Sequence, residues 1–179
     1  MAFPNDLLAS HIASQAGGFE PQRDGAGVLQ VNFPADAQGD LTTLMLAVKA
    51  VALPIRTMGQ ATISYLAGYA KVPTKPDEPG DLTVTVHDYV DVQVYDMLHR
   101  WSKLVHDLTT GFSGFSSQIK SSGALVYFGP DGSLEREWRL IGIWPNTLIP
   151  ARTLDYENNN PVQLEYTFVM DNYIFEDEE

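Results

Sequence analysis

The feature that most constrains this chain is a long alternation of apolar and polar residues near its C-terminus, over residues 161–175. The apolar positions, two residues apart, are Val162, Leu164, Tyr166, Phe168 and Met170. A period of two predicts a strand with one buried face, and this run exceeds the usual length of ~5–6 residues. At roughly 3.3 Å per residue, residues 162–174 would extend about 40 Å. Such a strand is longer than a small monomeric domain needs, which suggests a sheet that continues into a larger structure.

Further strands are predicted over residues 28–33, 42–51, 62–70 and 81–87 from alternation and from their β-branched and aromatic content. The first two should form a hairpin, although residues 44–48 could equally form a buried helix. Leu53-Pro54 should end the second strand. Residues 73–80 contain three prolines and predict an exposed loop, and residues 109–123 predict a flexible one. Asp131-Gly132 predicts a hairpin between residues 124–128 and 134–144.

One strong helix is predicted, over about residues 90–108. Its apolar positions recur at helical spacing and are Val94, Met97, Leu98, Trp101, Leu104, Val105 and Leu108. A weaker helix could form over residues 4–15, with Asn5 as its N-cap, and would belong to a mobile arm or dock on a partner. The order of strands, one helix and more strands predicts an antiparallel α+β or β-barrel domain and excludes a βαβ fold.

The charge balance limits the partners that this chain can have. Its formal net charge is −12, from 23 acidic and 11 basic residues among 179. That surplus opposes tight binding to nucleic acid, because no excess of cations can release DNA counterions. There are no cysteines, which excludes disulfides and thiolate chemistry. Because the chain has no signal peptide and no apolar run of ~20 residues, we expect a cytoplasmic origin without membrane insertion.

A search for catalytic or metal-binding patterns is largely negative, and we expect no enzyme, no cofactor and no metal. His99 and His106 could share a helix face, but a solvated flank is the simpler interpretation. Residues 111–115 lack the spacing of a nucleophile elbow. Residues 155–166 begin with the spacing of a calcium loop, yet they lack its glycine and its final glutamate.

Charged and aromatic residues instead indicate surfaces between molecules. Residues 135–139 alternate in charge, as in a solvated face or in a face that makes ion pairs between subunits. Trp101, Trp138 and Trp144 are typical of core and interface anchors. The acidic residues 176–179 predict a solvated tail.

Several segments, in this order, resemble the tail tube proteins of contractile-tailed bacteriophages, over roughly residues 28–175. The resemblance rests on residues 49–54 (Lys-Ala-Val-Ala-Leu53-Pro54), on residues 82–86 followed by a helix with Leu98 and Trp101, and on Trp144-Pro145. It continues through Asp155-Tyr156-Glu157-Asn158-Asn159, then Gln163-Leu164-Glu165-Tyr166-Thr167-Phe168, and ends on Asp171 and Tyr173. The Trp-Pro to Thr-Phe part is the most specific.

The resemblance implies a mainly β subunit, an antiparallel sandwich or half-barrel with one flanking helix. Residues 1–27 would be an N-terminal arm, residues 28–175 the tube domain and residues 176–179 an acidic tail. Six subunits would form a ring, and stacked rings would form the inner tube of a contractile tail that conducts DNA during ejection. Partners would be further copies, the sheath, baseplate and terminator proteins, a tape measure protein inside the tube, and DNA in passage. The protein would be assembled in the host cytoplasm and located in the virion.

The resemblance also implies which residues have structural or interface roles. They are Leu53, Pro54, Trp101, Trp138, Trp144, Pro145, Asp155, Tyr156, Asn158, Asn159, Gln163, Glu165, Tyr166 and Phe168. Two alternatives stay open. One is the tube-initiating protein of the baseplate. The other is a monomeric β-barrel that binds a small molecule and has a closed apolar cavity.

Overall fold

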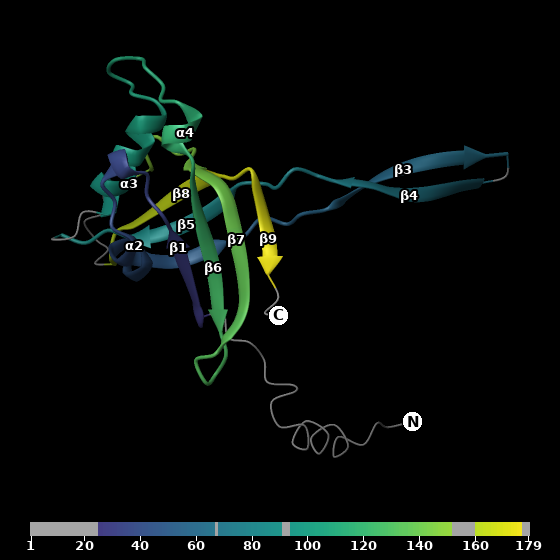
Figure 1. Ribbon diagram of the computed structural model, residues 1–179, viewed down its shortest axis with the longest axis horizontal. Helices are drawn as coiled ribbons and strands as arrows, with labels where there is room; N and C mark the ends of the chain where they lie inside the picture. The colour runs from purple at the N-terminus through teal and green to yellow at the C-terminus, as the bar shows by residue number, and fades with distance from the viewer. Residues whose placement is uncertain (1–24, 67, 91–93, 152–159, 177–179) are drawn as a thin grey trace.

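The computed structural model describes residues 25–66, 68–90, 94–151 and 160–176. These residues form a β-rich body, from which one two-stranded hairpin projects far to one side (Figure 1). The predicted N-terminal helix, residues 155–159 and the last three residues of the acidic tail lie outside the described residues.

The main sheet has a continuous path of six strands in the order β1-β6-β7-β8-β5-β2. They are β1 (Gly27–Val31), β6 (Ser121–Phe128), β7 (Leu134–Pro145), β8 (Gln163–Val169), β5 (Leu82–His87) and β2 (Val48–Ala52). A seventh strand, β9 (Asn172–Glu176), pairs with β7. All these pairings are antiparallel, and within the described residues the path ends at β1 and β2 without closing into a barrel. The predicted antiparallel, mainly β fold is therefore confirmed.

The helices lie on one side of this sheet and at one of its ends (Figure 1). They are the 3-10 helix η1 (Ala35–Ala37), α2 (Leu41–Ala47), α3 (Val94–Val105) and the short α4 (Ser116–Ile119). Of the two alternatives for residues 42–51, the helix is correct up to Ala47 and the strand from Val48 onward. Asp40 caps α2 by accepting hydrogen bonds from the Thr42 and Thr43 amides. The predicted first hairpin is wrong, since β1 pairs with β6 and β2 pairs with β5.

Helix α3 confirms the one strong helix prediction and provides the centre of the core. Val94, Met97, Leu98 and Trp101 are buried. The Trp101 ring lies 5.7 Å from that of Phe168 on β8, and its indole N–H donates to the Ile119 carbonyl at 2.9 Å. The apolar stripe of the helix thus packs into the same core as the buried residues of β5 and β8, as the helical periodicity requires.

The alternating segment over residues 161–175 forms two strands, so the prediction of one unbroken strand is wrong. β8 ends at Val169 and β9 begins at Asn172. The break leaves the register along β7 unchanged, since Trp144 pairs with Val169 and Ile141 pairs with Asn172. The assignment of faces holds for Leu164, Tyr166, Phe168 and Met170, which are all buried, and is wrong for Val162, which precedes β8 and is exposed.

The break between β8 and β9 coincides with a bend in the neighbouring strand β7. Gly142 on β7 has a φ of +68°, and a side chain there would collide with the Asp171 carboxylate. The Asp171 amide donates to the Ile141 carbonyl at 3.0 Å, and the Lys120 ammonium lies 2.6 and 2.7 Å from the two Asp171 carboxylate oxygens. Glycine is needed at residue 142 because the backbone enters the left-handed region at a crowded position. The long segment therefore joins the two halves of the sheet at an angle.

The projecting hairpin lies in the connection between β2 and β5, and corrects a second prediction. It consists of β3 (Met58–Tyr65) and β4 (Gly68–Pro76), which pair antiparallel. The proline-rich segment predicted as a loop therefore begins inside β4. A two-stranded ribbon tolerates prolines because both of its strands are edge strands. Residues 109–123, predicted as a flexible loop, contain α4 and the start of β6.

Candidate functional site

The β3–β4 hairpin has two chemically different faces, which its register defines. Residues directly opposite in an antiparallel pair share a face. Ala61 pairs with Val72, Ile63 with Ala70, and Tyr65 with Gly68, whereas the alternate pairs are Gln60–Pro73, Thr62–Lys71 and Ser64–Tyr69. The first set contains only apolar residues, glycine and one tyrosine, and we call it the apolar hairpin face. The second set is mostly polar.

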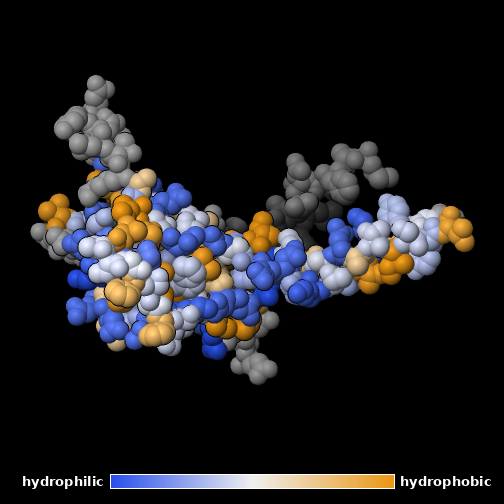
Figure 2. Space-filling model, turned by 90° about the horizontal axis from the view of Figure 1, so that it is seen from above, coloured by the Kyte–Doolittle hydropathy of each residue, from blue (hydrophilic) through white to orange (hydrophobic). Residues whose placement is uncertain are grey.

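The apolar hairpin face is exposed in the single chain. Ile63 is 45% exposed, Tyr65 is 64% exposed and Val72 is 41% exposed. The hairpin stands clear of the body, and apolar residues are visible along it and at its tip in Figure 2. An isolated two-stranded hairpin is marginally stable in water, and contiguous exposed apolar surface commonly marks a site of protein association. The geometry therefore indicates that another protein surface covers this face.

The hairpin also differs from the rest of the chain in charge. Residues 55–76 contain Arg56, Lys71 and Lys75 and no carboxylate, within a chain of net charge −12. A cationic, partly apolar projection on an acidic protein is suited to contact with an acidic surface.

The base of the hairpin is fixed to the body by β9. The Tyr173 hydroxyl donates to the Pro54 carbonyl at 2.9 Å, and the Arg56 guanidinium donates to the Asn172 side chain at 2.6 Å. The Thr57 hydroxyl donates to the Asp77 carboxylate at 2.6 Å and closes the two strands together. These contacts hold the direction in which the hairpin leaves the body.

The sheet face opposite α3 is polar and is a second candidate surface. Alternation places Thr83 and Thr85 of β5 and Gln163 and Glu165 of β8 on this face, since their neighbours are buried against α3. The Lys49 ammonium donates to the Gln163 side chain at 2.9 Å. We call this the open sheet face. It carries small hydroxyls, amides and charges of both signs.

The two ends of the strand path form a third candidate surface. β1 pairs only with β6 and β2 only with β5, so each has one unpaired edge among the described strands. Exposed edges readily pair with strands of other chains. The two edges lie at opposite ends of one open sheet, an arrangement that a ring of copies could complete.

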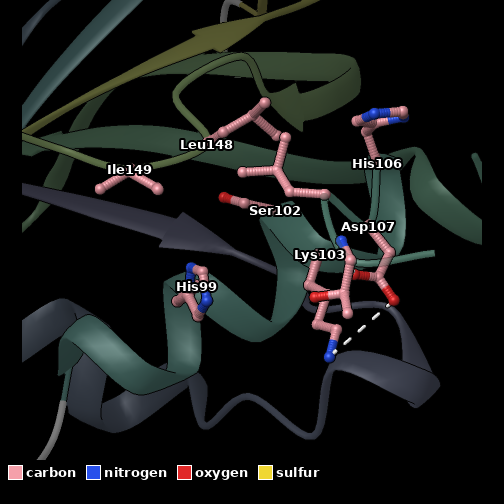
Figure 3. Close-up of a pocket in the computed structure, with 9 residues that line it drawn as sticks. His99, Ser102, Lys103, His106, Asp107, Leu148 and Ile149 are labelled. Atoms are coloured by element: carbon pink, nitrogen blue, oxygen red, sulfur yellow. Dashed lines mark hydrogen bonds and ion pairs between the residues drawn. The ribbon is translucent and has the colours of Figure 1, made fainter. Parts of the chain in front are cut away.

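A cavity of about 220 Å³ lies beside the C-terminal half of α3 (Figure 3). It is lined by His99, Ser102, Lys103, His106, Asp107, Leu108, Thr109, Leu148 and Ile149. The Lys103 ammonium lies 4.0 Å from the Asp107 carboxylate, and His106 Nδ1 lies 2.9 Å from the Ser113 hydroxyl. The pKa of Asp107 is lowered, mainly by the hydrogen bond that its carboxylate accepts from the Thr109 amide. His99 and His106 therefore lie on the same side, as predicted. The side chain beside them in the cavity is that of Lys103, not a third histidine.

The cavity lacks the features of an active site. Its volume is below the ~300 Å³ at which pockets for small molecules begin. The described residues include no group of three or more His, Asp or Glu side chains that could hold a metal ion.

No helix among the described residues is both long enough and apolar enough to cross a bilayer.

Several of the fourteen predicted site residues belong to the core or pack against it. Trp101, Tyr166 and Phe168 are fully buried, and Pro145 is buried where β7 pairs with β8. Leu53 is packed against the core. These side chains stabilise the fold and are unavailable to a partner.

The remaining predicted residues reach the surface or lie outside the description. Trp138 is partly buried between Tyr127 and Phe175, with ring centroids at 5.3 and 5.4 Å. Trp144 lines a cavity of about 290 Å³ beside Lys120 and Asp171. Gln163 and Glu165 lie on the open sheet face, and Pro54 accepts the Tyr173 hydrogen bond. Asp155, Tyr156, Asn158 and Asn159 lie outside the described residues.

Sequence reasoning missed the apolar hairpin face. Side chains alternate between two faces both before and after Gly68, which indicates two strands. The continuous apolar run nevertheless predicts a single strand over residues 62–70. The turn before Gly68 is hard to recognise in the sequence, because Leu66 precedes it and no cluster of polar residues separates the two strands. The bend at Gly142 and Asp171 was also missed.

Comparisons with known proteins give structural matches only. No family model matches the chain, and no curated protein matches it either. A chain in the tube-terminating cap of the anti-feeding prophage has a TM-score of 0.65 at 11% identity, over 88% of this chain and 91% of that one.

Two chains from an extracellular contractile injection system are similar in the same way. One, from the sheath/tube terminator in the extended state, has a TM-score of 0.64 at 13% identity, over 90% of this chain and 100% of that one. The other, from the sheath–tube complex in the extended state, has a TM-score of 0.63 at 14% identity, over 91% of this chain and 96% of that one. The chain therefore has the fold of tube and tube-terminator components of contractile injection systems.

Proposed function

We propose that this protein is a structural subunit whose copies form stacked hexameric rings, the inner tube of a contractile tail. The observation that carries the proposal is the projecting β3–β4 hairpin, whose apolar face stays exposed among the described residues. A monomer gains nothing from holding Ile63, Tyr65 and Val72 in water, whereas a neighbouring copy would bury them.

Ring closure would supply the missing partners of the main sheet. The unpaired edges of β1 and β2 would each face a neighbouring copy around the ring, as a heterologous contact that closes on rotation. The sheets of the copies would then form one wall without free edges.

The open sheet face would line the channel of such a tube. The opposite face is covered by α3 and its core, so only this face is free to meet a cargo. Threonine, glutamine and balanced charges offer a cargo no strong binding site. DNA would pass such a wall without the cation clusters that retain it.

A tube terminator is the second candidate, supported by the similar folds of two terminator chains. Proteins of this fold in a baseplate are a third candidate, since a chain from an anti-feeding prophage baseplate has a TM-score of 0.62 at 8% identity. A monomeric barrel with a closed apolar cavity is disfavoured by the open path of the described strands. Under all three of the assembly roles, the sheath and baseplate would be partners.

Electron microscopy and analytical ultracentrifugation of the purified full chain test the proposal. We expect six-fold rings, and tubes of constant diameter at high protein concentration. Rings that never lengthen, even at high concentration, would favour the terminator. A monomer at all concentrations would overturn the proposal.

A further inference from the structure

The body has two distinct ends, which lie at opposite ends of β6. At one end, the described chain begins: the Phe128 amide donates to the Ala26 carbonyl at 2.8 Å, beside the β6–β7 turn. At the other, α4 leads directly into Ser121. The eight residues of β6 separate these ends by about 23 Å at the rise of a strand. We call them the turn end and the α4 end (Figure 1).

The α4 end presents apolar side chains around the cavity beside α3. Phe112 is 78% exposed, Phe115 is 76% exposed and Ile149 is 59% exposed, and Leu108 lies at the cavity itself. Figure 2 views the molecule from this end, and apolar residues reach the surface of the body among polar ones. The cavity is too small for a typical cofactor but has room for a few side chains.

The cavity rim carries one cation and one carboxylate, Lys103 and Asp107, which lie 4.0 Å apart. Lys103, His99 and His106 line it, and its one carboxylate, Asp107, is already engaged by Lys103 and by Thr109 and Thr110. A neighbour's β3–β4 hairpin would therefore find no free carboxylate there for the three cations of residues 55–76. An apolar segment with carboxylates and few cations fits the rim better.

Residues 1–24 of the chain have this chemistry. They contain Leu7, Leu8 and Ile12 at helical spacing, three carboxylates (Asp6, Glu20 and Asp24) and one arginine, Arg23. They leave the body at the turn end, and 24 residues can reach at most about 80 Å when extended. In a stack of copies whose β6 strands run along the tube axis, the turn end of one body would face the α4 end of the next.

We propose that the N-terminal segment of one copy docks on the α4 end of a neighbouring copy, with its Leu7, Leu8 and Ile12 stripe on Leu108, Phe112 and Ile149. The inference rests on the proposed function, since it joins stacked copies. The contact is heterologous and does not close on itself, so it propagates along the tube axis. It buries the exposed apolar side chains of the α4 end against the apolar stripe of the N-terminal segment.

Cross-linking between two single-cysteine chains tests the docking, because the natural chain has no cysteine. A Leu8→Cys chain is mixed with a tagged Phe112→Cys chain, and in parallel with a tagged Glu135→Cys chain, whose cysteine lies near the turn end. Neither chain can form an internal disulfide. After oxidation, docking predicts at least about tenfold more heterodimer with Phe112→Cys than with Glu135→Cys, because docking raises the effective concentration of the thiols. Equal yields with both would overturn the docking.

Electron microscopy of Leu8→Asp and of its neighbour Ser10→Asp separates this proposal from the proposed function. Docking predicts that Leu8→Asp gives rings without tubes, while Ser10→Asp, off the apolar stripe, still gives tubes. Normal tubes from Leu8→Asp would overturn the docking and leave the tube function standing. Absence of rings from the unmodified chain would overturn both.

Discussion

Among single residues, Tyr166 shows most clearly the difference between a residue that specifies the fold and one that contacts partners. Its side chain is fully buried, and its hydroxyl makes no hydrogen bond to any of the described residues. The pKa of this phenol is raised, mainly because burial removes the water that would stabilise its charged form. Such an unpaired polar atom destabilises the folded state.

Tyr166→Phe should therefore increase the free energy of unfolding, by about 1 kcal/mol, because the orphan hydroxyl is removed and the ring is kept. Tyr166→Asp should instead abolish folding or reduce that free energy by more than ~4 kcal/mol, since an unpaired charge would enter the core. Chemical denaturation followed by tryptophan fluorescence measures both. A destabilised Tyr166→Phe variant would show that the hydroxyl has a partner in solution.

Two glycines with positive φ offer a matched test of the bend in β7. Gly142 has a φ of +68° with the Asp171 carboxylate against it, whereas Gly132 has a φ of +81° with nothing within 4 Å. Gly132→Ala should cost about 1–2 kcal/mol, the strain of the left-handed region alone. Gly142→Ala should cost more, because it also displaces Asp171 from Lys120. Equal losses in unfolding free energy would contradict the assigned crowding at Gly142.

At the scale of the element, the β3–β4 hairpin separates stability from assembly. Its side chains contact little of the body, so substitutions there should change the unfolding free energy of the single chain by no more than about 0.5 kcal/mol. Ile63→Asp places a charge on the apolar hairpin face and should prevent rings and tubes. Thr62→Asp, one residue away, lies on the polar face opposite Lys71 and should leave assembly intact.

Sedimentation velocity and electron microscopy distinguish these two variants, and circular dichroism confirms that both fold. Assembly that survives Ile63→Asp, or fails equally in both variants, would show that the apolar hairpin face is not an interface.

The whole molecule should lose stability in acid through specific carboxylates. The pKa values of Asp40, Asp107 and Asp131 are all lowered, chiefly by hydrogen bonds from nearby threonine and serine groups. A carboxyl whose folded pKa lies below its unfolded value of about 3.9 adds stability above that value. The added stability is lost as the pH falls through the folded pKa.

The thermal midpoint should therefore fall between about pH 5 and pH 3, and more steeply in the natural chain than in the triple variant Asp40→Asn, Asp107→Asn and Asp131→Asn. Asparagine keeps a hydrogen-bond acceptor at each position but does not titrate in this range. Calorimetry across this range measures both slopes. Identical slopes would mean that these three aspartates do not couple folding to pH.

The sequence by itself determined the elements whose pattern is local. Alternation predicted β5 and the buried face of β8, and the apolar stripe predicted α3, because side-chain direction follows directly from backbone period. The Asp131-Gly132 turn predicted the β6–β7 hairpin. The ordered resemblance led to the fold that the structural comparisons support. The absence of cysteine and the net charge of −12 needed no structure at all.

Only the tertiary structure decided which strands pair and where the chain bends. β1 meets β6, about 90 residues later, and local pattern contains no information on such distant partners. The bend at Gly142 and Asp171 depends on two segments meeting, and the two faces of the β3–β4 hairpin depend on its register. These contacts join residues far apart along the chain or set one strand against another, so the surfaces available for assembly became visible only in three dimensions.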